Sequence, residues 1–167
     1  MKKIFLIEDN ADIRNNTAEI LELANYAVIT AENGKEGIEK AIEHKPGLII
    51  CDIMMPELDG YAVLHAVQKH EQLRYTPFIF LTAKTERTDF RKGMELGADD
   101  YISKPFDGTE LLNAVDARFK KAEQIKTDLV AAGGKHPEKI AAKELLHALI
   151  QNRSINKYKK KQVVYSE

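Results

Sequence analysis

Short apolar runs alternate with stretches of helical periodicity along the first three quarters of the chain. Runs rich in the residues favoured in buried strands occupy 3–7, 26–30, 48–51, 77–81 and 101–103. Stretches with apolar residues three or four positions apart follow them at 12–24, 35–43, 61–69, 88–96 and from 111 onward. Five strands, each followed by a helix, predict an α/β fold with a parallel sheet, right-handed crossovers and helices on both faces.

The helical pattern that begins at Leu111 continues further than the others. Its apolar stripe reaches residue 130, and Gly133 and Gly134 follow shortly after. Glycine is favoured just past the end of a helix. A second helical pattern covers 137–150, and 162–165 is typical of a strand. The sequence therefore predicts a domain over 1–124 and a helical, basic extension over 125–167.

The charge of the chain is unevenly distributed. The net charge is −1, but residues 1–124 carry 16 Lys and Arg against 22 Asp and Glu, whereas residues 133–167 carry 8 against 3. Such asymmetry favours two parts with different partners. The one cysteine, Cys51, excludes an internal disulfide, and no apolar run approaches the roughly 18 residues that span a bilayer. We therefore expect a cytoplasmic protein that makes no membrane contact.

Polar residues stand where four of the predicted strands end. They are Glu8 and Asp9, Asp52, Thr82, and Lys104. Ligands of open α/β sheets bind beyond the carboxyl ends of the strands, so these side chains are expected to converge. Converging carboxylates repel one another unless a cation neutralises them, and carboxylate oxygen is the ligand that Mg²⁺ prefers. The pattern predicts a Mg²⁺ site in which Asp52 is the nucleophile toward a phosphoryl group.

The sequence resembles the receiver domain of two-component response regulators over residues 1–124. The matching segments are 4–9 (IFLIED), 51–60 (CDIMMPELDG), 80–83 (FLTA), 97–101 (GADDY) and 104–106 (KPF). The resemblance implies a flavodoxin-like five-stranded sheet in the order 2-1-3-4-5. It also implies a protein that accepts a phosphoryl group from a histidine kinase or a phosphotransfer protein, and that acts as a switch rather than as a conventional enzyme.

The resemblance also implies roles for the residues around the predicted site. Asp52 is expected to be the phosphoacceptor, assisted by Lys104 and Thr82. Glu8 and Asp9 form the acid pocket, and with Asp52 and the main-chain carbonyl of Met54 they would hold Mg²⁺.

Further positions are expected to tune or transmit the signal. Thr82 and Tyr101 resemble the switch pair of the family, and Lys104–Pro105 resembles its cis peptide bond. Met54 and Lys84 stand two positions beyond the phosphoacceptor and the switch threonine, where bulk and charge should hinder an attacking water. The face formed by 88–96, 101–103 and the helix from 111 is here called the 4-5-5 face, and phosphorylation is expected to alter it. We also expect a homodimer, either through that face or through the long last helix.

The output of the switch is left open by the sequence. The segment 145–167 resembles the entry to a cyclic-nucleotide-binding β-roll of catabolite-activator-type transcription regulators, which would make the chain a truncated piece of a transcription regulator that binds DNA through an output domain absent or incomplete here. The basic cluster 157–161 is otherwise a solvated face or a nucleic-acid arm. The alternatives are a stand-alone relay or adaptor protein and a haloacid-dehalogenase-like phosphatase. The phosphatase is disfavoured because Met54 stands where its general acid would be.

Overall fold

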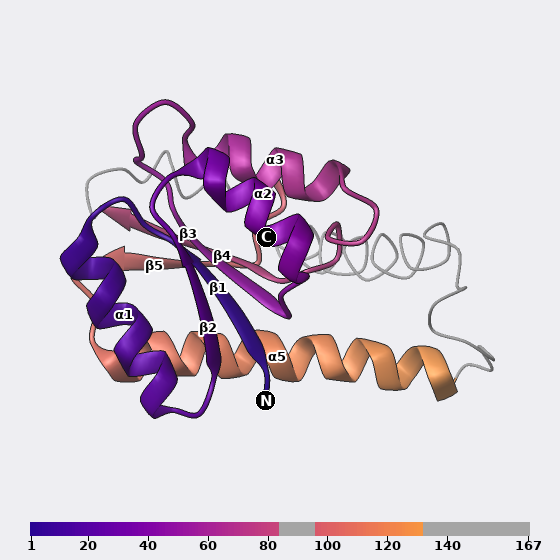
Figure 1. Cartoon of the computed structure of the whole chain (residues 1–167). Coiled ribbons are helices and arrows are strands. Elements are labelled where there is room, and N and C mark those ends of the chain that lie inside the picture. The colour runs from indigo at the N-terminus through magenta and orange to yellow at the C-terminus, as the bar shows by residue number, and fades with distance from the viewer. Residues whose placement is uncertain (84–95, 132–167) are drawn as a thin grey trace, which may run out of the picture. The chain divides into compact units, whose positions relative to one another are not determined.

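The computed structural model describes residues 1–83 and 96–131 and contains the predicted parallel sheet (Figure 1). Its strands are β1 (Lys3–Ile7), β2 (Ala27–Ala31), β3 (Leu48–Asp52), β4 (Phe78–Ala83) and β5 (Asp100–Lys104). They lie in the order β2-β1-β3-β4-β5, and every neighbouring pair is parallel. The predicted fold class and strand order are confirmed.

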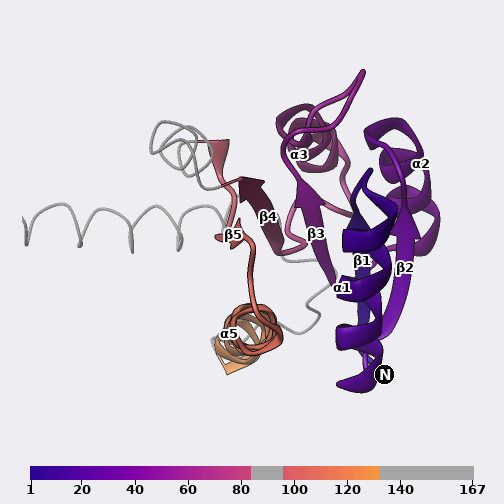
Figure 2. The ribbon, with the colours of Figure 1, turned by 90° about the vertical axis from the view of Figure 1, so that its left-hand side faces the viewer.

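Helices cover both faces of this sheet, as the turned view in Figure 2 shows. In the described residues they are α1 (Ala11–Leu23), α2 (Gly34–His44), α3 (Gly60–Lys69) and α5 (Gly108–Ala131). One core cluster joins the sheet to α1 and α5 through Leu21, Leu111 and Val115, and a second joins it to α2 and α3 through Ala41 and Val63. The helices therefore bury one apolar stripe each, as their periodicity predicts.

The central strands place the acidic residues beside one another. Ile4 to Ile7 of β1 and Leu48 to Cys51 of β3 are all fully buried, which explains their unbroken apolar sequence. In the β1–β3 register Ile7 lies opposite Cys51. The next residue of each strand, Glu8 and Asp52, therefore emerges at the same edge of the sheet.

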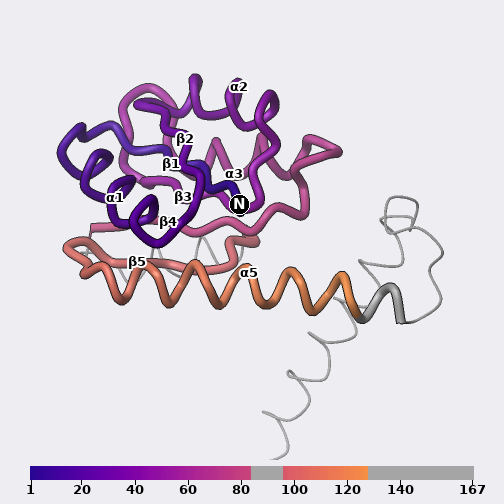
Figure 3. The backbone as a smooth tube through the Cα atoms, turned by 60° about the horizontal axis from the view of Figure 1, so that its bottom comes forward, coloured from indigo at the N-terminus to yellow at the C-terminus, as the bar shows by residue number. Residues whose placement is uncertain are grey.

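Helix α5 is a single unbroken helix of 24 residues (Figure 3). The chain divides into two units, Met1–Ala122 and Glu123–Glu167, and the boundary between them falls within α5. No helix in residues 1–83 and 96–131 combines the length and apolar character that crossing a membrane requires.

Several sequence predictions concern residues that lie outside the described ones. They are the helix over 88–96 with Lys84, the helix over 137–150, the basic cluster 157–161, the strand over 162–165 and the cyclic-nucleotide-binding resemblance over 145–167. These stay predictions, as does the division of the chain at residues 124 and 125.

Candidate functional site

The acid pair stands where β1 passes into α1. The Glu8 amide donates to the Ala31 carbonyl at 3.1 Å, the last rung toward β2, and the Glu8 side chain is 1% exposed. Asn10 then begins α1, because its side chain accepts from the amides of Asp12 and Ile13. Strand and cap thus leave only Glu8 and Asp9 between them, and the side chain of Asp9 is exposed.

Asp52 is the last residue of β3 and is 4% exposed. The main chain beyond it is held by two hydrogen bonds, from the Ile53 amide to the Leu81 carbonyl at 3.0 Å and from the Gly60 amide to the Ile53 carbonyl at 2.9 Å. A side chain at Gly60 would collide with the Asp52 carbonyl and would come 3.0 Å from the Ile53 Cα. Only glycine allows this close packing around Asp52.

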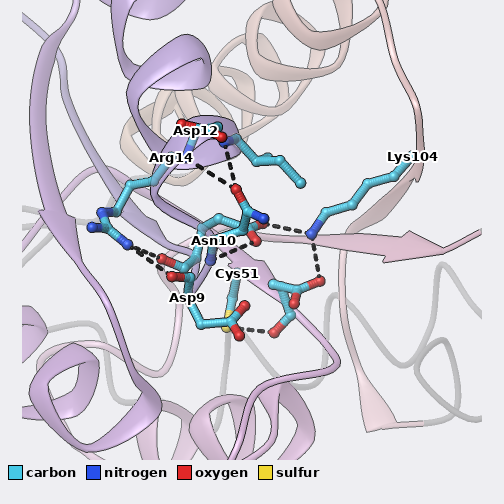
Figure 4. Close-up of polar contacts among 9 residues, drawn as sticks. Asp9, Asn10, Asp12, Arg14, Cys51 and Lys104 are labelled. Carbon is cyan, nitrogen blue, oxygen red and sulfur yellow. Dashed lines mark hydrogen bonds and ion pairs between the residues drawn. The ribbon is translucent and has the colours of Figure 1, made fainter.

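Lys104 ends β5 and joins the two buried carboxylates (Figure 4). Its Nζ donates to Glu8 Oε2 at 2.6 Å and to Asp52 Oδ1 at 2.9 Å. Burial lowers the pKa of Lys104, but the hydrogen bonds to Glu8 and Asp52 outweigh it, so that the pKa is raised and the ammonium stays charged. The Lys104–Pro105 peptide bond is cis.

The pKa of Glu8 is raised as well. Burial of the carboxyl is the largest cause, and the charge of Asp52 adds to it against the opposing hydrogen bond from Lys104. One ammonium therefore does not fully compensate two buried carboxylates, and a second cation would be attracted to the site.

A cluster of three carboxylates is suited to such a cation. In the described part of the chain, Glu8, Asp9 and Asp52 can each offer an oxygen, and these oxygens lie within 4.8 Å of one another. Carboxylate oxygens are the ligands of hard divalent cations such as Mg²⁺. The donor set and the excess of negative charge both fit this cation.

The remaining predicted residues that the structure describes lie on β4, on β5 and in the loop after β3. Thr82 lies near the end of β4 and its hydroxyl donates to the Ala83 carbonyl at 3.1 Å. The ring of Tyr101 packs on that of Phe80, with centroids 5.3 Å apart. The Met54 side chain is 71% exposed. Lys84 lies outside the described residues.

Arg14 has a role at this site that the sequence did not predict, whereas Cys51 is the small buried residue that its sequence indicates. The Arg14 guanidinium contacts the main chain of the acid pair, a role that the sequence signals only by a cation one turn into the following helix. Cys51 precedes Asp52 and is fully buried, and burial raises the pKa of its thiol well above the usual value. The thiol donates to the Asp52 carbonyl at 3.2 Å.

Comparisons with known proteins match the domain that carries this site. The family model of the response regulator receiver domain matches residues 4–116. The transcriptional regulatory protein PhoP of Bacillus subtilis, named for alkaline phosphatase synthesis, is 42% identical over 122 residues, which are 73% of this chain and 50% of PhoP. The chain spans about half the length of such curated relatives.

Two solved structures share the fold. The chemotaxis protein CheY4 of Vibrio cholerae superposes with a TM-score of 0.68 at 31% identity, covering 71% of this chain and 98% of CheY4. The receiver domain of the sensor histidine kinase PA1611 from Pseudomonas aeruginosa, with magnesium coordinated in its active-site cleft, gives 0.67 at 28% identity and covers 71% and 98%.

Proposed function

The chain belongs to the response regulator receiver domain family, and from this premise we propose that Asp52 accepts a phosphoryl group from a histidine kinase or a phosphotransfer protein. The observation that carries the proposal is the pairing of Lys104 with both Asp52 and Glu8 at the carboxyl ends of three strands. A carboxylate paired with an ammonium is a suitable nucleophile for phosphorus.

We propose that Mg²⁺ is the cofactor, held by Glu8, Asp9, Asp52 and the main-chain carbonyl of Met54. The support is the cluster of three carboxylates and the magnesium ion of the related PA1611 receiver domain. When bound, Mg²⁺ neutralises charge on the phosphoryl oxygens.

The residues of the chain then have separate tasks in the transfer. A carboxylate oxygen of Asp52 forms a bond to phosphorus while the bond from phosphorus to the imidazole nitrogen of the donor breaks, and that nitrogen keeps the electron pair. The Lys104 ammonium then donates to one phosphoryl oxygen, and the Thr82 hydroxyl can donate to another. The donor imidazole leaves as a neutral ring when its other nitrogen carries a proton, so neither Lys104 nor Thr82 is assigned a proton transfer in this step.

Thr82 and Tyr101 are proposed to carry the signal away from Asp52. A new doubly charged group at Asp52 would draw the Thr82 hydroxyl from its present acceptor, the Ala83 carbonyl. The space that it leaves favours movement of the Tyr101 ring, which packs beside Phe80 on the neighbouring strand. This switch would alter the 4-5-5 face and promote self-association there.

Beryllofluoride, a mimic of the acyl phosphate, should increase the sedimentation coefficient, and an unchanged value at tens of micromolar protein would contradict this step.

The proposed output is control of transcription, because the relative PhoP is a transcriptional regulatory protein. We assign the receiver domain to 1–124 and an extension to 125–167. DNA contact would require a region beyond the receiver domain. We also propose that the reaction takes place in the cytoplasm, together with the proposed kinase partner. Receiver domains of this family act as switches rather than as conventional enzymes.

The test is phosphorylation by acetyl phosphate with Mg²⁺, followed by the intact mass of the protein. We expect the wild type to gain one phosphoryl group and Asp52→Asn to gain none. Omitting Mg²⁺ should also abolish the gain. An equal gain in the wild type and in Asp52→Asn would overturn the assignment.

A further inference from the structure

Arg14 contacts the main chain of the acid pair, and Figure 4 shows its guanidinium beside Asp9. Its backbone amide belongs to the first turn of α1 and donates to the Asn10 carbonyl. Its side chain turns back, and Nη1 donates to the main-chain carbonyls of Glu8 at 2.7 Å and Asp9 at 3.2 Å. Only 15% of the side chain is exposed. Arg14 thus binds the backbone of both residues whose carboxylates form the acid pocket.

These two carbonyls lie beyond the regular pairing of β1. The register of β1 with β2 and β3 ends at Ile7, and the pairing beyond it is the hydrogen bond of the Glu8 amide to the Ala31 carbonyl. A carbonyl left without a donor in a partly buried position destabilises the fold. Arg14 supplies that donor and thereby fixes the orientation of the two peptide groups from which the carboxylates project.

The guanidinium also lies beside the loop after β2. Its Nη2 lies 3.8 Å from Glu32 Oε2, and the Glu32 amide donates to Glu36 Oε2 at 3.0 Å. Lys40 binds Glu36 at 2.6 Å and the Thr30 carbonyl at 3.0 Å. The planar guanidinium of arginine can donate to several acceptors at once in a fixed geometry. The ammonium of lysine is a compact group that lacks this fixed arrangement of donors. Arg14 therefore connects the acid pair to a fixed part of the fold.

We propose that Arg14 is a positioning residue that holds the Glu8–Asp9 main chain in the conformation that binds a divalent cation. The inference rests on the proposed function, since it assigns Arg14 to the cation site of that reaction. Arg14 contacts carbonyls and not the carboxylates of the pair, so it acts through the backbone. Its loss should weaken cation binding while leaving the nucleophile Asp52 unchanged.

The test follows backbone amide chemical shifts of residues 8–10 as Mg²⁺ is added to the full chain, without any phosphodonor. The variants are Arg14→Met, which keeps the length of the side chain without its donors, and Arg14→Lys, which keeps the charge. Arg74→Met is the matched control, because Arg74 also donates to a main-chain carbonyl, that of Glu71, far from the site along the chain. Melting temperatures of all variants separate a loss of folding from a loss of binding.

We expect Arg14→Met to raise the Kd for Mg²⁺ about 10-fold, the size seen when the outer support of a metal ligand is removed. Arg14→Lys should lie between that value and the wild type, and Arg74→Met should stay within twofold of the wild type. At saturating Mg²⁺, phosphorylation of Arg14→Met should return to within threefold of the wild-type rate, an order-of-magnitude expectation for a residue that acts on binding alone.

Three results would overturn the inference. They are a Kd of folded Arg14→Met within twofold of the wild type, full affinity in Arg14→Lys, and a phosphorylation defect that saturating Mg²⁺ does not repair. If Arg14→Met does not fold, the comparison of Arg14→Lys with the wild type decides. A wild type that binds Mg²⁺ but is not phosphorylated on Asp52 would refute the proposed function, while the titration would still test Arg14.

Discussion

Lys104 Nζ lies 2.6 Å from Glu8 Oε2, although 96 positions separate the two residues along the chain. Strands β3 and β4 lie between β1 and β5 in the sheet, so the long side chain of Lys104 reaches across both of their ends. The same ammonium binds Asp52 on the way. One ammonium therefore connects Glu8, an acid of the proposed metal site, with Asp52, the proposed nucleophile.

Replacing Lys104 with Met should slow phosphorylation by acetyl phosphate about 100-fold, the scale of removing one preorganised charge from a reacting group. The variant keeps Asp52 but has no ammonium to stabilise the negative charge on the phosphoryl oxygens during the transfer. The rate is measured by intact mass at saturating Mg²⁺. Lys69→Met, at an exposed position of α3, is the control and should react at the wild-type rate. A wild-type rate in Lys104→Met would remove the lysine from the mechanism.

Gly60→Ala should destabilise the fold by about 2 kcal/mol or more, because the added methyl group has no space next to the Asp52 carbonyl. Urea unfolding measures the effect. Gly108→Ala, at the first residue of α5, is the matched control. Its new Cβ would meet Ile20 at an ordinary 3.5 Å, so the higher helix propensity of alanine should make it neutral or slightly stabilising. Equal stabilities of the two variants would contradict the packing described around Asp52.

Tyr26→Phe tests how α5 is fastened to the domain. The Tyr26 hydroxyl donates to Asp116 Oδ1 at 2.5 Å, and its ring stacks on Phe119 with centroids 5.7 Å apart. The variant keeps the stacking and loses the hydrogen bond, so its free energy of unfolding at pH 7 should fall by about 1 kcal/mol. Tyr75→Phe, at a 47% exposed tyrosine, should change little.

The difference between wild type and Tyr26→Phe should also depend on pH. Burial and the hydrogen bond to Asp116 raise the pKa of Tyr26 from 10.0 to about 12. The folded state therefore binds this proton more tightly than the unfolded state does. The stabilisation is fully present below pH 10.0 and is lost as the pH rises through 12. Urea titrations of both proteins at several pH values check this, and a difference that stays constant across the range would refute the bond.

Met54→Ala should shorten the lifetime of the phosphorylated state. Met54 is 71% exposed two residues after Asp52, where its bulk can hinder a water that approaches the phosphoryl group. We expect the wild type to keep its phosphoryl group for minutes or longer, and the variant to lose it several-fold faster. Intact mass followed after removal of acetyl phosphate measures both lifetimes. A loss within seconds from the wild type, with no phosphatase added, would contradict the shielding role.

The sequence predicted the fold because its central strands are buried on both faces. The runs at 3–7 and 48–51 contain only residues that such strands need, apart from the exposed Lys3, and their ends locate Glu8 and Asp52 within one residue. Parallel strands bring their carboxyl ends to one edge, so the convergence of these acids with Lys104 followed from topology alone. The distances among them did not, because they depend on side-chain conformation.

Sequence reasoning missed two side-chain hydrogen bonds, that of Arg14 to nearby main-chain carbonyls and that of Tyr26 to a distant carboxylate. Arg14 has the same periodicity as any exposed helical residue, and no pattern indicates that it turns back to Glu8 and Asp9. The bond between Tyr26 and Asp116 joins residues 90 positions apart and has no local signal. Such contacts are set by tertiary packing, which a periodicity analysis does not contain.

The central claim is that the phosphoryl group is carried by Asp52, and the location of that group tests it most directly. The protein is phosphorylated with acetyl phosphate and Mg²⁺, and the acyl phosphate is then reduced with borohydride, which converts a phosphorylated aspartate into homoserine. Peptide mass spectrometry identifies the converted residue. The account predicts homoserine at position 52 and at no other aspartate, whereas homoserine at Asp9, or none at position 52 in a protein that has gained a phosphoryl group, would contradict it.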